Sequence, residues 1–192
     1  RDQPRSRGLG DVYKRQLEWL IEEPHNPAQL ITAPCTSPEA DYITDKGYRG
    51  SSLYGGTADL AIIRELFKNT IKGAQALGID KDYQVRLQSS LERLRPYHIG
   101  KRGNLMEWYH DWDDQDWHHR HQSHLLGLYP FHQISLAQTP DLAQAATKTL
   151  EIKGDKSTGW STGWRINLWA RLHRQDKAYQ ILRKLLTYVS PE

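Results

Sequence analysis

The sequence has little cysteine, little phenylalanine and no long apolar run. It contains one cysteine, one methionine and two phenylalanines among 192 residues. The lone Cys35 excludes a framework of internal disulfides and says little about the compartment. No apolar run approaches the ~18 residues that a membrane-spanning helix needs, so we expect no membrane partner.

An excess of one charge is also missing from most of the chain. The formal net charge is +3, and residues 1–16, with five basic and two acidic side chains, account for all of it. Residues 17–192 are therefore neutral overall. A nucleic-acid groove needs clustered positive charge in the folded part, so we expect no nucleic-acid partner.

Residues 1–16 lack the apolar core of a secretory signal peptide. They are typical of a non-native leader joined to a domain that begins within a helix at "LEWLIEEP". We therefore divide the chain into a leader, 1–16, and one partial domain, 17–192.

Apolar residues at helical spacing predict a series of helices. Thr57 or Asp59 is a candidate N-cap for the first, which Gly78 ends, and Pro96 stops the second. The predicted helices cover about 57–77, 80–95, a short segment from 123, 139–154, 164–172 and 181–189. No stretch alternates convincingly like a strand, so the pattern predicts an all-α fold of helix hairpins separated by long polar loops at 25–54 and 97–120.

The first loop contains "CTSPEADY", which holds Glu39. Because Ser37 precedes a proline, it favours extended backbone, and Glu39 follows in a stiff local frame. A Ser-Pro-Glu run is also a good helix start, since the helix dipole favours an early glutamate. From these residues alone, Glu39 is either a functional carboxyl group or part of a helix N-terminus.

The second loop ends in "HHRHQSHL", residues 118–125, with four histidines and one arginine. His121 and His124 have the i,i+3 spacing of zinc ligands on a helix, and acids precede them. However, the H-E-x-x-H arrangement is absent, and the fixed cation of Arg120 opposes a metal dication. Arg and His together also supply donors for sugar hydroxyls or carboxylates, and a solvated charged face is a further alternative.

Tryptophan and tyrosine are abundant, with seven and ten residues. Their rings offer a flat apolar face and a polar edge, which suits sugars, although most such rings belong to cores and interfaces. The tandem repeat "STGWSTGW" places Trp160 and Trp164 four residues apart. Trp160 is therefore a candidate wall of a sugar site, or else part of a packed helix start.

Four segments together resemble glycoside hydrolase family 95, the α-L-fucosidases. The segments are "TSPEA", "GGTADLAIIRELF", "LMEWYHDWDDQDWHHRHQSHLLGLYP" and "GWSTGWRINLWARL", in the family's order. The resemblance implies an (α/α)6 toroid of helix hairpins, of which this chain supplies an incomplete part. It also implies inverting hydrolysis of terminal α-L-fucose, commonly α-1,2-linked, without a metal or other cofactor.

The resemblance assigns three residues directly. The family's general acid falls on Glu39, and its sugar-holding Arg-His pair falls on Arg120 and His121. The family activates water with an Asn pair upstream and an Asp downstream, neither of which matches a residue here. We therefore expect the catalytic base outside this chain, in the remaining domains of a full-length enzyme, and we expect the chain alone to be inactive.

The resemblance leaves alternatives open. A non-catalytic carbohydrate-binding helical module would keep Arg120, His121 and Trp160, and an α-L-galactosidase would differ only in the C6 hydroxyl of its substrate. A metal-dependent hydrolase using the histidines is a third alternative. The expected partner is a fucosylated glycan, and the substrate class suggests a secreted or periplasmic protein. We also expect the chain alone to be unstable, because a toroid would bury its apolar stripes at 60–71 and 181–189 against further hairpins.

Overall fold

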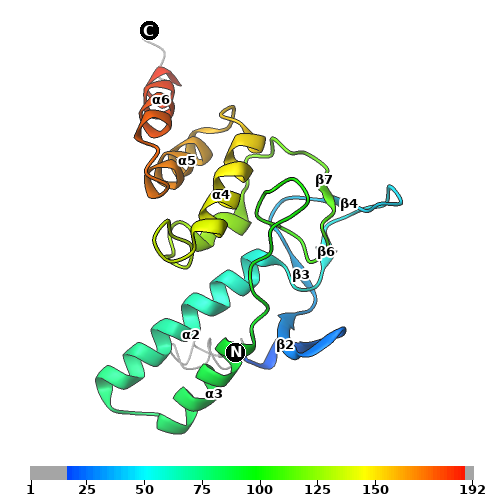
Figure 1. Ribbon diagram of the computed structural model, residues 1–192, viewed down its shortest axis with the longest axis vertical. Coiled ribbons are helices and arrows are strands. Elements are labelled where there is room, and N and C mark those ends of the chain that lie inside the picture. Colours follow the sequence, from blue (N-terminus) through cyan, green and yellow to red (C-terminus); the bar gives the residue numbers. More distant parts are fainter. Residues whose placement is uncertain (1–16, 189–192) are drawn as a thin grey trace, which may run out of the picture.

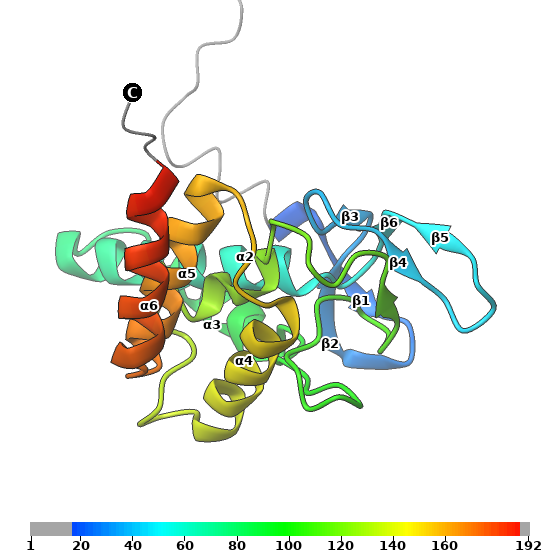
Figure 2. The same cartoon turned by 90° about the horizontal axis from the view of Figure 1, so that it is seen from above.

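The computed structural model describes residues 17–188 and arranges them as two helical parts beside a group of small sheets (Figures 1 and 2). The predicted leader, 1–16, and Val189 of the predicted last stripe lie outside these residues. The α-helices are α2 (Thr57–Leu77), α3 (Lys81–Arg93), α4 (Pro140–Lys153), α5 (Gly159–Arg171) and α6 (Gln175–Leu185). Short 3-10 helices are η1 (Ser123–Gly127) and η2 (Leu186–Tyr188).

The helices confirm the predicted pattern, with differences at their ends, the largest at α6, which begins at Gln175, six residues before the predicted 181. The first begins after Gly56 rather than at a side-chain cap, and Gly78 ends it with a φ of 68°, the left-handed conformation that glycine adopts without strain. Thr139 and Pro140 open α4 as predicted, and Gly154 follows its last residue. The tandem repeat runs from Ser157, just before α5, into the first turns of this helix, which therefore begins earlier than its apolar spacing indicates.

The prediction of an all-α fold is wrong, because seven short strands form three sheets within residues 17–188. The strands are β1 (Leu20–Glu23), β2 (Asn26–Thr32), β3 (Cys35–Thr36), β4 (Tyr42–Ile43), β5 (Arg49–Gly50), β6 (Ser52–Leu53) and β7 (Asp113–Asp114). Five of them are two residues long, too short to show the alternation that identifies a strand. Of the expected helix at "LEWLIEEP", Leu17 and Glu18 are helical, but Leu20–Glu23 form β1, whose pairing with β2 satisfies its backbone instead.

One sheet connects the two polar loops. Strand β4 pairs with β5 on one side and with β7 on the other, so that Tyr42 lies opposite Gly50 and also opposite Asp114. Since β4 follows Glu39 and β7 precedes the histidine-rich segment, this sheet brings the two candidate segments to the same edge of the molecule.

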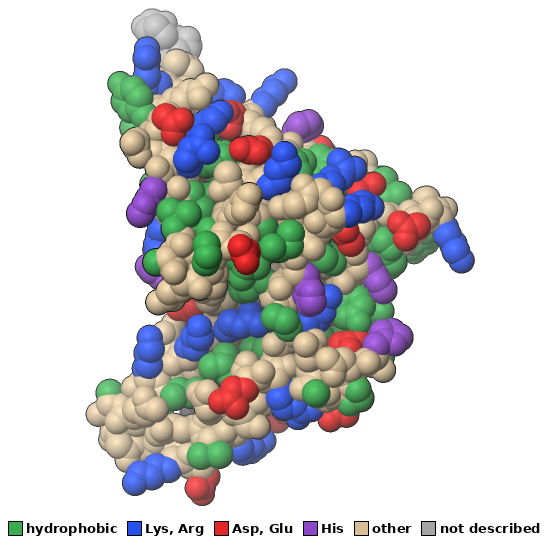
Figure 3. All heavy atoms as spheres, in the orientation of Figure 1, with side chains coloured by type: hydrophobic (Ala, Val, Ile, Leu, Met, Phe, Trp, Pro, Cys, Tyr) green, Lys and Arg blue, Asp and Glu red, His purple; other side chains and the backbone are tan. Residues whose placement is uncertain are grey.

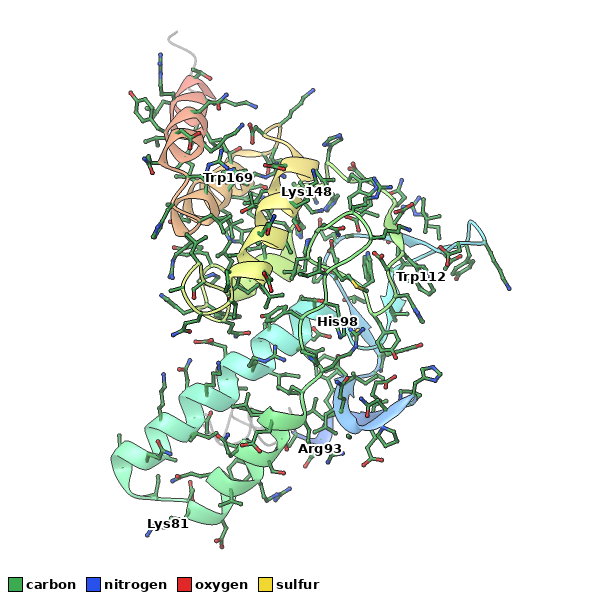
Figure 4. The ribbon with its side chains drawn as sticks, viewed as in Figure 1. Lys81, Arg93, His98, Trp112, Lys148 and Trp169 are labelled. Carbon is green, nitrogen blue, oxygen red and sulfur yellow. The ribbon has the colours of Figure 1, made fainter. Side chains whose placement is uncertain are left out.

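Two apolar cores lie under the helices. In the first, α2 packs on α3 and β2, and it buries Leu60, Ile63, Phe67 and Ile71. The second lies among η1, α4, α5 and α6, where Trp169 is 1% exposed (Figure 4). The stripe of α2 and Ile181 of α6 are therefore buried within this chain, and the expectation that they lie uncovered is wrong.

A different apolar stripe is exposed on α6 and η2. Tyr179, Leu182 and Leu186 have helical spacing and are 63%, 40% and 69% exposed. The pairs α2–α3 and α5–α6 are helix hairpins, the unit from which helical toroids are built, and residues 17–188 hold five complete α-helices. No helix in the described part is long and apolar enough to cross a membrane.

Candidate active site

Glu39 lies in a tight turn between β3 and β4. The Ala40 N–H donates to the Ser37 carbonyl at 2.8 Å, which closes the turn and carries the chain directly into β4. The alternative that Ser-Pro-Glu starts a helix is therefore wrong. The turn leaves 57% of the Glu39 side chain exposed, so this carboxyl group is accessible to a ligand.

Arg120 and His121 both face Glu39. The Arg120 guanidinium donates to Glu39 Oε2, and His121 Nε2 lies 3.5 Å from the same oxygen. His121 Nδ1 lies 2.9 Å from the Pro38 carbonyl, which only accepts, so Nδ1 carries the hydrogen of that bond. In the neutral imidazole, Nε2 is then an acceptor directed toward Glu39.

Trp160 extends this group. Its indole is 52% exposed, and its ring meets the His121 ring edge-on at 5.0 Å between centroids. Trp164 stacks behind it at 6.2 Å and donates its indole N–H to the Tyr129 carbonyl at 3.0 Å. An exposed indole beside a carboxylate, a guanidinium and an imidazole is the kind of surface on which sugars bind.

The first turns of α5 also hold the backbone of the histidine-rich segment. Ser161 Oγ donates to the Arg120 carbonyl at 2.6 Å. The Arg165 side chain is 1% exposed and donates to the carbonyls of Lys153 and Gly154, with a longer contact of 3.5 Å to that of His119. Arg120 is therefore fixed at its backbone, while 42% of its side chain is exposed.

The four histidines diverge. His118 Nδ1 bonds to the Lys153 carbonyl at 3.1 Å, and His124 is buried against Glu107. His119 contacts His121 through its ring, at 5.2 Å between centroids. Among residues 17–188, no three His, Cys, Asp or Glu side chains come together to hold a metal ion. The zinc pair suggested by spacing, His121 and His124, therefore does not form.

Behind the turn lies a buried charged cluster, which we define as Glu107, Asp114, His124 and Lys153. Glu107 Oε2 lies 3.0 Å from His124 Nδ1 and 3.9 Å from Lys153 Nζ. Lys153 Nζ lies 3.3 Å from Asp114 Oδ2, and the other Asp114 oxygen accepts from the Trp108 indole at 3.0 Å. None of the four residues is more than 6% exposed.

The cluster sets the pKa of both acids. Burial raises the pKa of Glu107, but His124, Lys153 and the Ser37 hydroxyl together outweigh it and lower this pKa to about 2. Burial and the neighbouring Glu107 raise the pKa of Asp114, against the effects of Lys153 and His124. The space among these side chains and the nearby tryptophans is only about 10 Å³, roughly the room of one water, so it holds no sugar.

The other acids of the second loop have local partners. Asp113 pairs with Arg102 at 3.2 Å, and Asp111 accepts from the Lys101 N–H at 2.6 Å. Asp116 accepts from the His118 N–H at 2.9 Å. Nearby, Trp112 lies beside the small sheets (Figure 4), and its ring contacts those of Tyr42 and His110 at 4.8 and 4.4 Å between centroids.

The structure thus brings Glu39, Arg120, His121 and Trp160 into one contiguous group. The sequence indicated these four, but not the buried cluster or the anchoring roles of Ser37, Ser161 and Arg165. Nothing in the sequence distinguishes Glu107 from the other acids of the second loop, and Lys153 is marked only by its place at the end of a helix.

Basic and acidic side chains are interspersed on the face shown in Figure 3.

The chain matches the catalytic domain of glycosyl hydrolase family 95 over residues 9–192, and it belongs to this family. The match begins inside the segment that the sequence suggested as a leader, and the division at residue 17 stays a prediction.

Curated proteins with similar sequences carry fucosidase names. The chain is 38% identical to "Alpha-L-fucosidase 2" of Arabidopsis thaliana, over 91% of its length and 21% of that protein. It is 32% identical to "Probable alpha-fucosidase A" of Aspergillus niger, over 93% of the chain and 23% of that protein. It is 28% identical to the protein of the same name from Aspergillus oryzae, over 94% of the chain and 26% of that protein. The chain therefore spans about a quarter of the length of these relatives.

Proposed function

We propose that this chain is part of the catalytic domain of an inverting α-L-fucosidase that hydrolyses terminal α-L-fucosyl linkages, α-1,2 linkages above all, in glycans. The observation that carries the proposal is the contiguous group of Glu39, Arg120, His121 and Trp160. Family membership and the fucosidase names of the relatives support it. Because the chain spans only a quarter of those relatives, we infer that an incomplete toroid is completed by further parts of a longer enzyme.

In the proposed reaction, Glu39 donates its proton to the glycosidic oxygen as the bond to the sugar breaks. Arg120 and His121 bind hydroxyl groups of the fucose, and Trp160 packs against an apolar face of the ring. Inversion requires a second group that activates water, with ~6.5–9.5 Å between the two carboxyl groups of a typical inverting pair. The loop acids are held by local partners, so we assign the water-activating group to the remainder of the enzyme.

The contact between Arg120 and Glu39 gives this mechanism a definite order. A general acid must reach the leaving oxygen, whereas the Glu39 carboxyl group is in contact with the Arg120 guanidinium. We infer that this pair is the resting arrangement, and that a bound sugar engages Arg120 and so frees Glu39 to reach the glycosidic oxygen. His121 Nε2, at 3.5 Å from Glu39 Oε2, is then close enough to bind a sugar hydroxyl as well.

The test is the Glu39→Gln variant in the full-length enzyme that carries this segment. Glutamine keeps the shape but has no proton to transfer, so we expect kcat on 2′-fucosyllactose to fall ~10²–10⁴-fold. An aryl fucoside with a good leaving group should lose less. Proton NMR of the first product formed should show the anomer opposite to that of the substrate. Near-normal turnover of 2′-fucosyllactose by the variant would remove Glu39 from this role.

The same assay separates the other candidate functions. A full-length protein that binds fucose without turning it over would be a carbohydrate-binding module. Faster turnover of an α-L-galactoside than of the matching fucoside would identify an α-L-galactosidase. The chain of 192 residues alone should release no fucose, because it supplies an acid without the group that activates water.

A further inference from the structure

Ser37 joins the Glu39 turn to the buried charged cluster. It lies two residues before Glu39, is 1% exposed, and donates from Oγ to Glu107 Oε1 at 2.6 Å. The two residues are 70 positions apart in the sequence, so the bond connects the first polar loop to the second. A short hydrogen bond to an ionised carboxylate is among the stronger kinds in proteins.

Glu107 is itself held on several sides. His124 from η1 and Lys153 from the end of α4 face its other oxygen, and Asp114 of β7 faces Lys153 in turn. The backbone of Glu107 is also held, because its carbonyl accepts from the Thr57 N–H at 3.2 Å at the start of α2. The carboxylate that receives Ser37 is therefore held directly by groups from η1 and α4, while β7 acts through Lys153 and α2 holds the Glu107 backbone.

The turn has a second anchor on its other side. The Pro38 carbonyl accepts from Ser123 Oγ and from His121 Nδ1, both at 2.9 Å. The Glu39 side chain has only Arg120 and His121 as polar partners among the described residues, and more than half of it is exposed. Little packing holds this carboxyl group, so its position depends on the backbone of residues 37–38.

We propose that Glu107 is a positioning residue for Glu39 and acts through the Ser37 hydroxyl, with His124 and Lys153 fixing the Glu107 carboxylate. The inference rests on the proposed function, in which Glu39 is the general acid. A proton transfer requires the acid within hydrogen-bond reach of the leaving oxygen, and a displacement of about 1 Å costs on the order of 10²-fold in rate. Loss of the Ser37 bond should therefore slow the step that needs the proton.

The decisive variant is Ser37→Ala in the full-length enzyme. It removes the hydroxyl and leaves every member of the buried cluster in place, whereas removing Glu107 would take from His124 and Lys153 a partner that they share in a desolvated site and would threaten folding. The matched control is Ser135→Ala. The Ser135 hydroxyl also makes a hydrogen bond within a loop, accepting from the Gln138 N–H at 3.1 Å, but it lies before α4, at the other end of this helix from Lys153.

For Ser37→Ala we expect kcat on 2′-fucosyllactose to fall about 10²-fold, with KM changed less than threefold. An aryl fucoside whose leaving group departs without protonation should lose less than about threefold. Ser135→Ala should match the parent on both substrates. A merely structural role for Ser37 would reduce both rates equally, by reducing the fraction of folded enzyme.

Equal losses on the two substrates, or full activity on both, would overturn the inference. The Glu39→Gln variant, assayed beside these, keeps the two proposals apart. If Glu39→Gln is impaired on 2′-fucosyllactose and Ser37→Ala is not, Glu39 is the acid and Glu107 does not position it. If Glu39→Gln is fully active, the proposed function has failed, and a loss in Ser37→Ala then has another cause.

Discussion

Two neighbouring groups of charged and titratable side chains differ in their exposure to solvent. At the edge, Glu39 and Arg120 form an ion pair with 57% and 42% of their side chains exposed. Behind it, Glu107, Asp114, His124 and Lys153 bring their charges together with almost no exposure. The two groups share the same loops, since Ser37 touches the inner one and Glu39 belongs to the outer one.

The difference in exposure decides how easily each group can lose one of its partners. An exposed ion pair contributes ~0–1 kcal/mol to stability and breaks readily when a ligand competes for one partner. A buried charge that loses its partner is costly, because the remaining ion stays desolvated. In the proposed reaction the edge can therefore exchange partners, while the buried cluster is expected to keep the backbone of both loops in place.

The largest effect on stability should come from removing one carboxylate of the buried cluster. We expect Glu107→Ala to lower the stability of this region by ~3–5 kcal/mol, because His124 and Lys153 lose their shared partner in a desolvated site. Glu39→Ala, the matched change at the edge, should cost less than ~1 kcal/mol. Hydrogen exchange of backbone amides in residues 104–127 of the full-length enzyme measures the loss of local stability in each of the two variants. Equal protection in the two variants would show that the cluster does not support these loops.

Much of the helical fold followed from the sequence, because each α-helix carries its own apolar period and end signals. Gly78 and Pro140 marked helix ends correctly. The sheets did not follow, since a two-residue strand such as β4 is defined by partners that lie far away in the chain. For the same reason Glu39, Arg120 and His121 were identified from their motifs, but the bond from Ser37 to Glu107 was not. A long-range pairing of buried charges leaves no local pattern.

The next effect concerns the exposed partners of Glu39. We expect Arg120→Ala to lower kcat/KM for 2′-fucosyllactose about 10–10²-fold, since a hydrogen bond to a charged group contributes ~1.5–3 kcal/mol. His121→Ala should act in the same direction with a smaller loss, because a neutral imidazole makes weaker hydrogen bonds.

The control for this pair is Arg174→Ala, which breaks a surface ion pair with Asp176 at 3.5 Å and should leave kcat/KM unchanged. Melting temperatures of all three variants should stay close to that of the parent. Unchanged kinetics in both Arg120→Ala and His121→Ala would make this edge a charged surface without a role in sugar binding. Added zinc or a chelator should not alter the activity of the parent.

A third effect is the acid sensitivity of the buried cluster. The folded-state pKa of Glu107 is lowered to about 2 from an ordinary 4.5. A lowered carboxyl pKa contributes stability that is complete above the unfolded value and lost as the pH falls from about 4.5 towards 2. Asp114, whose pKa is raised, acts in the opposite sense and offsets part of this loss.

Urea midpoints measured between about pH 4.5 and 2 should fall less steeply in Glu107→Gln than in the parent. Glu151→Gln, an exposed site on α4, should keep the parent slope, and identical slopes in all three proteins would contradict the prediction.

The smallest effect concerns Asp59, a partly buried acid in the first turn of α2. Burial raises the pKa of Asp59 to about 6 from an ordinary 3.8, although Thr32 and Cys35 act against the shift. The folded protein therefore holds this proton more tightly than the unfolded chain does, and stability falls as the pH rises from about 3.8 through 6. In Asp59→Asn that fall should vanish, so the variant should match or exceed the parent in urea midpoint at pH 7 and gain nothing at pH 4. Asp141→Asn is the matched control, because Asp141 is an exposed acid in the first turn of α4 and its loss changes the same helix-end interaction. If Asp59→Asn lowers the midpoint at pH 7 more than Asp141→Asn does, the ionised Asp59 stabilises the start of α2, and burial there is not the dominant influence.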